Sequence, residues 1–151
     1  MTVPAGPHKG IWPARLRNDW QVREGWMSNN NLLSNALRLF GFIFLLVYPL
    51  AMFWPSGWAW HEGVPASNDY FLMIVGIYAT LGVFLIRAAS DPVANASLIW
   101  FTVWSSVVHA LVMAYESVRN PMQGGHLMGD VPALLLVAVV LGVLMSKAQR
   151  T

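Results

Sequence analysis

The chain has 151 residues, of which 56% are hydrophobic and 11% are charged, whereas soluble domains carry about 25% charged residues. A soluble domain of this size cannot hide so much apolar surface, so the composition indicates a membrane protein that contacts a lipid bilayer. The net charge of +2 is too small to favour nucleic-acid binding, and the absence of cysteine excludes disulfides, iron–sulfur clusters and thiol catalysis.

Residues 1–31 form a basic, Trp-containing N-terminal arm. Trp12, Leu16 and Trp20 recur every four residues and are accompanied by basic side chains: Arg15, Arg17 and Arg23. This pattern predicts a short helix on the inner surface of the membrane, with Trp in the interface. Two alternatives stay open: a disordered basic arm that only enforces topology, and a segment that docks on a partner subunit.

Four apolar stretches in residues 32–146 are long enough to cross a bilayer. They cover about residues 32–54, 69–89, 95–118 and 127–146, and a short tail, 147–151, follows. Each stretch of roughly 20 residues spans about 30 Å as a helix. Helices are the only option, because an open sheet leaves backbone groups unpaired in lipid. The sequence therefore predicts an all-α integral membrane four-helix bundle.

The distribution of Lys and Arg predicts the orientation of the bundle. One side holds eight of these residues: Lys9, Arg15, Arg17, Arg23, Arg38, Arg87, Lys147 and Arg150. Only Arg119 falls on the other side. Because short cytoplasmic segments carry the excess of positive charge, both termini are expected in the cytoplasm.

The third apolar stretch has one polar face. At 100° per residue a single arc collects Thr102, Ser105, Ser106, His109, Met113 and Glu116. The opposite side collects Trp100, Trp104, Val107, Val108, Leu111 and Tyr115. We expect the polar arc to face the interior of the bundle and the Trp side to face lipid or another protein.

A candidate site lies in the outer half of the third and fourth spans. It consists of two histidines and two carboxylates: His109, Glu116, His126 and Asp130. Imidazole nitrogen and carboxylate oxygen suit a transition metal such as Zn, Fe, Mn or Cu(II). The same groups also suit a proton relay. No catalytic residue is predicted.

Structural roles compete with the metal site for each of these residues. Asp130 is a natural N-cap of the fourth helix, and Glu116 is one turn from Arg119. His126 follows two glycines and suits a solvated loop, while His109 suits a hydrogen bond to a serine or a carbonyl of a neighbouring helix.

The turn between the second and third spans offers a similar choice. It begins with Arg87 and contains Asp91 and Pro92. Arg87 and Asp91 are candidates for an ion pair across this turn. Alternatively, Asp91 orients the turn itself.

Three motifs carry a resemblance to a known family. They are the RAASDP turn, the WSSVVHA run and the GHLMGDVPAL segment, all within about residues 80–143. They resemble a family of small bacterial inner-membrane proteins of unknown function with four predicted helices. The resemblance implies a multi-pass protein of the bacterial inner membrane and implies no activity.

Function is predicted by class only. The leading hypothesis is an accessory or scaffolding subunit of a larger bacterial membrane complex of respiratory, photosynthetic or monooxygenase type, with other membrane subunits as partners. The alternative is a metal- or cofactor-binding membrane protein, or a proton or solute path. The chain lacks P-loop, GxGxxG, GxSxG and HExxH motifs, so an enzyme is not favoured.

Overall fold

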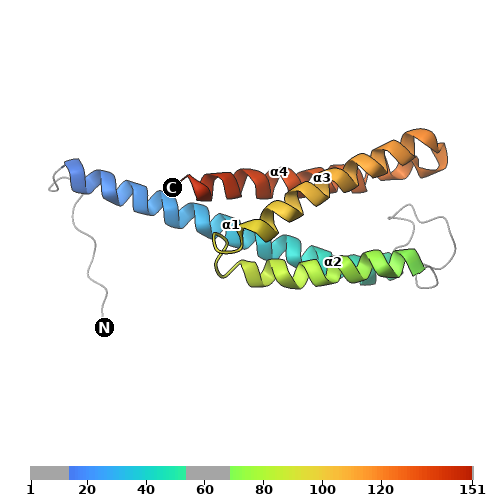
Figure 1. The fold of residues 1–151 in the computed structure, drawn as a ribbon, viewed down its shortest axis with the longest axis horizontal. Helices are drawn as coiled ribbons and strands as arrows, with labels where there is room; N and C mark the ends of the chain where they lie inside the picture. Colours follow the sequence, from blue (N-terminus) through green and yellow to red (C-terminus); the bar gives the residue numbers. More distant parts are fainter. Residues whose placement is uncertain (1–13, 54–68, 151) are drawn as a thin grey trace.

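The structure is a computed structural model that describes residues 14–53 and 69–150. This part of the chain is helical and contains no strand (Figure 1). Its elements are α1 (Ala14–Phe53), α2 (Asp69–Ala88), α3 (Ala96–Arg119), the 3-10 helix η3 (Pro121–Leu127) and α4 (Asp130–Gln149). Each of the four α-helices contains a segment long and apolar enough to cross a membrane. The predicted all-α membrane protein with four spans is therefore confirmed.

The helices pack as two antiparallel pairs. α1 lies along α2, α3 lies along α4, and α1 joins the pairs by also contacting α4. α2 and α3 follow one another in the chain but touch at few points. Figure 1 shows the two pairs diverging from the end that holds the α2–α3 turn. The bundle is therefore open along the α2–α3 side.

The apolar core lies toward the closed end of the bundle. Its fully buried large side chains come from all four helices: Leu33, Leu37, Leu85, Ile99, Leu141 and Met145. At the open end, by contrast, Phe53, Tyr70 and Val118 are at least three-quarters exposed. Because core packing holds the closed end only, the opposite halves of α2 and α3 make few contacts with one another.

The α1–α2 contact depends on two glycines. A methyl group on Gly41 would lie 2.7 Å from the carbonyl oxygen of Gly82, and one on Gly82 would lie 2.6 Å from that of Gly41. Neither distance is possible for a real Cβ atom. The two backbones therefore touch directly, which small residues permit in membrane helices.

The boundary predicted at residue 31 is not a break in the structure. α1 runs unbroken from Ala14 to Phe53, so the arm residues from 14 onward continue the first span as helix. Helix over this stretch favours the helical interpretation of the arm, whereas Trp12 lies outside the described residues. Residues 14–48 contain no proline, the residue that most strongly disfavours a helix interior, so no such breaker separates the arm from the span. Contact of the arm with the membrane surface stays a prediction.

The α-helix of the fourth span, α4, starts at Asp130 and ends at Gln149. Before it, Pro121–Leu127 forms a 3-10 helix, and Met128 and Gly129 form a turn. The apolar segment long enough to cross a membrane runs from Gly124 to Gln149 and so includes part of this connection. The glycines of the connection favour turns, which explains why the α-helix itself starts only at Asp130.

Asp91 orients the α2–α3 turn. Its Oδ1 accepts a hydrogen bond of 3.1 Å from the backbone N–H of Ala94, and its carbonyl oxygen accepts one of 2.8 Å from the Asn95 side chain. The hydroxyl of Ser90 donates to the carbonyl of Arg87. Of the two predicted roles, the structure supports Asp91 as the residue that shapes the turn.

Candidate functional site: a groove and a polar niche between α2 and α3

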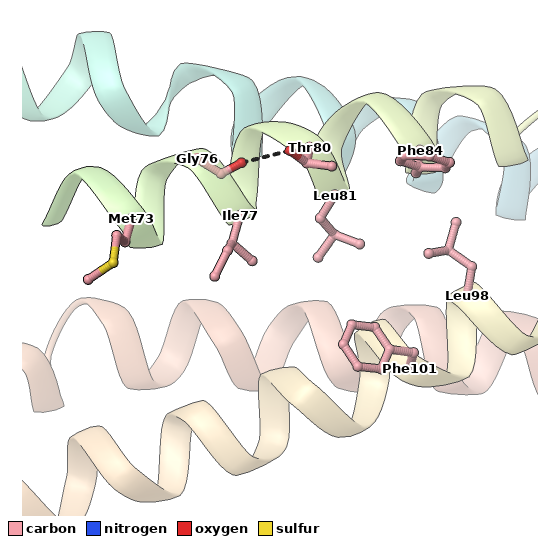
Figure 2. A pocket seen from close by; sticks show the side chains of 8 residues that line it. All are labelled: Met73, Gly76, Ile77, Thr80, Leu81, Phe84, Leu98 and Phe101. Carbon is pink, nitrogen blue, oxygen red and sulfur yellow. Dashed lines mark hydrogen bonds between the residues drawn. The ribbon is translucent and has the colours of Figure 1, made fainter. Parts of the chain in front are cut away.

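An apolar groove separates α2 from α3. Its volume is about 540 Å³, and Figure 2 shows the residues that line it: Met73, Gly76, Ile77, Thr80, Leu81, Phe84, Leu98 and Phe101. The hydroxyl of Thr80 donates to the carbonyl of Gly76 at 2.9 Å, within its own helix. No charged side chain lines the groove, so its chemistry suits an apolar occupant.

The α2 wall of the groove has the spacing of a helix-packing seam. Met73, Ile77, Thr80 and Phe84 follow one another at steps of four, three and four residues. This is the spacing that keeps a seam facing a partner helix. Gly76 lies within the seam, and nothing lies within 4 Å of the place its Cβ would occupy. The described part of the chain thus leaves this seam uncovered.

A smaller niche adjoins the groove. It has a volume of about 160 Å³ and is lined by Ile74, Ile77, Tyr78, Leu81, Phe101, Ser105, Ser106 and His109. Three of these residues, Ile77, Leu81 and Phe101, also line the groove. The polar groups of the niche lie near the middle of both helices, at the depth of the hydrocarbon core of a bilayer.

Tyr78 and His109 join the two walls of the niche. The phenol oxygen of Tyr78 lies 2.8 Å from Nδ1 of His109 in a side-chain hydrogen bond between α2 and α3. Their rings are tilted with centroids 5.9 Å apart, and Phe44 of α1 packs on Tyr78 at 5.0 Å. The sequence analysis expected a serine or a carbonyl as the partner of His109; the structure provides a tyrosine.

The buried hydroxyl of Ser106 differs from those of Thr102 and Ser105 in its hydrogen bonding. The hydroxyls of Thr102 and Ser105 donate to carbonyls of their own helix, at 2.9 and 3.2 Å. Ser106 is only 5% exposed and lines the niche. Within the described part of the chain its hydroxyl has no hydrogen-bond partner. An unpaired buried hydroxyl costs about 1–3 kcal/mol, so a polar group in the niche would relieve this cost.

The predicted four-residue metal site is not assembled. In the part of the chain that the structure describes, no three His, Asp or Glu side chains lie close enough together to hold a metal ion. His109 is paired with Tyr78 instead, and Glu116 is exposed. His126 and Asp130 do meet, through Nδ1 and Oδ2. Asp130 is close enough to Tyr78 and His109 for its charge to act on both.

The structural roles predicted for Asp130, His126 and Glu116 differ from those that the structure shows. Asp130 is the first residue of α4; the N-cap is Gly129, and no side chain caps the helix. The side chain of His126 is largely buried against Asp130, so the solvated-loop alternative is wrong. Arg119 places its guanidinium 5.4 Å from the ring centre of Tyr115 and donates to its hydroxyl at 3.3 Å. The structure therefore gives Arg119 a partner other than Glu116.

The predicted orientation of α3 is confirmed along most of the helix. Thr102 and Ser106 are buried, while the opposite side presents large exposed side chains: Trp104, Val108, Leu111 and Tyr115. There are two exceptions. Trp100 and Val107, which were predicted on the outward side, are partly buried against the core. At the end of the arc, Ser117 is buried and Glu116 is exposed. The two helix pairs diverge at this end, so the bundle does not enclose the charged side chain of Glu116.

Sequence reasoning missed Tyr78. A signal was present, because Tyr78 stands in the middle of an apolar span and a buried tyrosine hydroxyl needs a hydrogen-bond partner. His109 was the imidazole available at matching depth in the next span.

Comparison with known protein families gives one match. A family model described as a family of unknown function, DUF6632, matches residues 27–151. The chain belongs to the DUF6632 family. The match confirms the resemblance to a family of unknown function and extends it well beyond residues 80–143. No curated protein and no solved structure matches. The groove and the niche of this DUF6632 protein both lie within the matched residues.

Proposed function

We propose that this DUF6632 protein is an accessory or scaffolding subunit of a larger membrane complex in the bacterial inner membrane, and that its α2–α3 groove receives one apolar transmembrane helix of another subunit. Respiratory, photosynthetic and monooxygenase complexes are the candidate hosts. One observation carries the proposal: α2 presents a packing seam with an open glycine, and the described chain leaves that seam uncovered.

The shape of the groove favours a helix over lipid as its occupant. The seam from Met73 to Phe84 extends for about three helical turns. Acyl chains conform to any apolar surface, whereas close approach of a helix backbone needs a gap such as the one at Gly76. By contrast, Gly41 and Gly82 already lie within the α1–α2 contact. Gly76 offers the same kind of approach to a helix from outside.

The exposure of the walls agrees with this role. Ile77 is 68% exposed and Phe101 is 63% exposed, so these side chains reach their packing partners only when another body fills the groove. Since no charged side chain lines the groove, the partner helix must present an apolar or small-residue face. Van der Waals packing of such faces is what associates helices within a bilayer.

Purification from native membranes tests the proposal. A tagged full-length chain is extracted in a mild detergent and analysed by native mass spectrometry, together with Gly76→Leu, which fills the groove. The control is Phe42→Leu, at an exposed position of α1. A photoreactive amino acid at position 77 or 42 reports which face touches the partner.

We expect the wild type and Phe42→Leu to travel with a stoichiometric integral membrane subunit, and Gly76→Leu to lose it. Cross-links should form from position 77 and not from position 42. A wild-type chain that runs alone, as a monomer or as a homogeneous oligomer of itself, would overturn the accessory-subunit proposal.

A further inference from the structure

We propose that the niche of Tyr78, Ser106 and His109 is a binding site for a neutral six-membered ring that carries one hydroxyl or carbonyl oxygen. The inference rests on the niche and does not require a partner subunit. The niche extends from residues that it shares with the groove, such as Phe101, to Ser106, which is 5% exposed. A ring bound at Ser106 therefore lies at the buried end of the niche.

The volume of the niche matches one ring. It measures about 160 Å³, and an apolar protein cavity of about 150 Å³ is known to hold benzene. The apolar walls are formed by aliphatic and aromatic side chains: Ile74, Ile77, Leu81 and Phe101. Phe101 and Tyr78 supply aromatic rings, which favour tilted or offset contacts with another ring. Both size and lining thus suit a flat, mostly apolar group.

The polar side of the niche calls for one oxygen atom. The Ser106 hydroxyl has no partner in the described chain and can donate or accept a hydrogen bond. Beside it, the hydrogen bond between Tyr78 and His109 fixes both side chains. A hydroxyl or carbonyl oxygen on the ring satisfies Ser106. A neutral ligand suits the niche, because no Asp, Glu, Lys or Arg side chain lines it and the nearby carboxylate of Asp130 is bonded to His126. A charge on the ligand would have no partner in the niche and is costly at this depth.

Water is the competing occupant. Each water molecule occupies about 30 Å³ and needs two to four polar partners. Only one side of the niche offers polar groups, whereas the other side is formed by Ile74, Ile77, Leu81 and Phe101. Several waters would therefore face apolar walls without hydrogen bonds. A ring with a single oxygen forms a hydrogen bond on the polar side and leaves no water against the apolar side.

Ligand binding by ¹⁹F NMR tests the proposal on the full-length chain in lipid nanodiscs. The probe is 4-fluorophenol, and fluorobenzene is the matched ring without the oxygen. Empty nanodiscs correct for partition into lipid, and unlabelled phenol tests whether binding saturates. Ser106→Ala and Tyr78→Phe each remove one hydroxyl. Ser146→Ala, on α4 and outside the niche, makes the same chemical change elsewhere.

We expect saturable binding of 4-fluorophenol that is at least five-fold tighter than that of fluorobenzene. Loss of one hydrogen bond in Ser106→Ala should weaken 4-fluorophenol binding by about five-fold, and Ser146→Ala should leave it unchanged. Absence of saturable binding to the wild type, equal affinity for both probes, or an unchanged affinity in both Ser106→Ala and Tyr78→Phe would overturn the proposal. Tyr78→Phe keeps the test decisive if Ser106→Ala does not fold.

Discussion

The phenol oxygen of Tyr78 lies 2.8 Å from Nδ1 of His109, and this hydrogen bond joins α2 to α3 where the two helices otherwise hardly touch. It therefore links the α1–α2 pair to the α3–α4 pair near the middle of the membrane. Both residues line the niche, which adjoins the groove. Tyr78 and His109 thus have two roles, since they limit the separation of the pairs and join the α2 and α3 walls of the niche.

Removing this hydrogen bond should destabilise the bundle by a modest amount. Hydrogen bonds between membrane helices contribute about 0.6 kcal/mol on average and at most about 2 kcal/mol. We expect Tyr78→Phe to lower the free energy of unfolding in mixed micelles by that order. In a double-mutant cycle with His109→Leu, the two changes should be less than additive. Tyr115→Phe removes a hydroxyl whose hydrogen bond from Arg119 is exposed at a helix end, so it should have no measurable effect. Full additivity of the cycle would contradict the link.

The two glycines of α2 should respond in opposite ways to the same substitution. A methyl at Gly82 would meet the Gly41 carbonyl at 2.6 Å, whereas a methyl at Gly76 would meet nothing. Overpacking costs about 1–3 kcal/mol, so Gly82→Ala should lower the free energy of unfolding by this amount. Gly76→Ala should be neutral or stabilising, by up to about 1 kcal/mol from helix propensity. Equal effects at both positions would contradict the direct α1–α2 backbone contact.

The four spans could be predicted from sequence because a bilayer leaves the backbone little choice. A run of about 20 apolar residues must be a helix in lipid, and the structure has four. The buried face of α3 was predictable for a related reason, since Thr102 and Ser106 avoid hydrocarbon by turning inward. Hydropathy does not encode which helices pair. The α1–α2 contact depends on the match between Gly41 and Gly82, which is visible only in three dimensions.

The site was harder to predict because it depends on helix pairing. The sequence analysis grouped His109 with Glu116, since both lie on one face of one helix. In the structure the nearer partner of His109 is Tyr78, from another helix. The groove and the niche exist because α2 and α3 are separated. This separation cannot be predicted from the composition of either helix. Only the pair of His126 and Asp130 was within reach, because residues four apart in a short connection stay close in space.

The pair of His126 and Asp130 should hold the start of α4 in place. The side chains of both residues are largely buried, at 18% and 26% exposure, and they bond across the junction of η3 and α4. Asp130 also lies in the first turn of α4, where a carboxylate interacts favourably with the helix N-terminus. Asp130→Ala should therefore raise hydrogen exchange at the first hydrogen-bonded amides of α4, from Ala133 onward, by about ten-fold, equivalent to about 1.4 kcal/mol. Glu116→Ala, at an exposed carboxylate, is the matched control and should leave these amides unchanged.

Membrane orientation provides the last prediction. The α2–α3 turn region and the C-terminal end carry Arg87, Lys147 and Arg150, whereas the α3–α4 connection begins with Arg119 alone. Because positively charged segments stay in the cytoplasm, a fluorescent protein fused after residue 151 should fold and fluoresce there. Alkaline phosphatase inserted within residues 55–68 should be active outside. An active phosphatase at the C-terminus would reverse the orientation. The four spans would remain, but His126 and Asp130 would then lie toward the cytoplasmic leaflet.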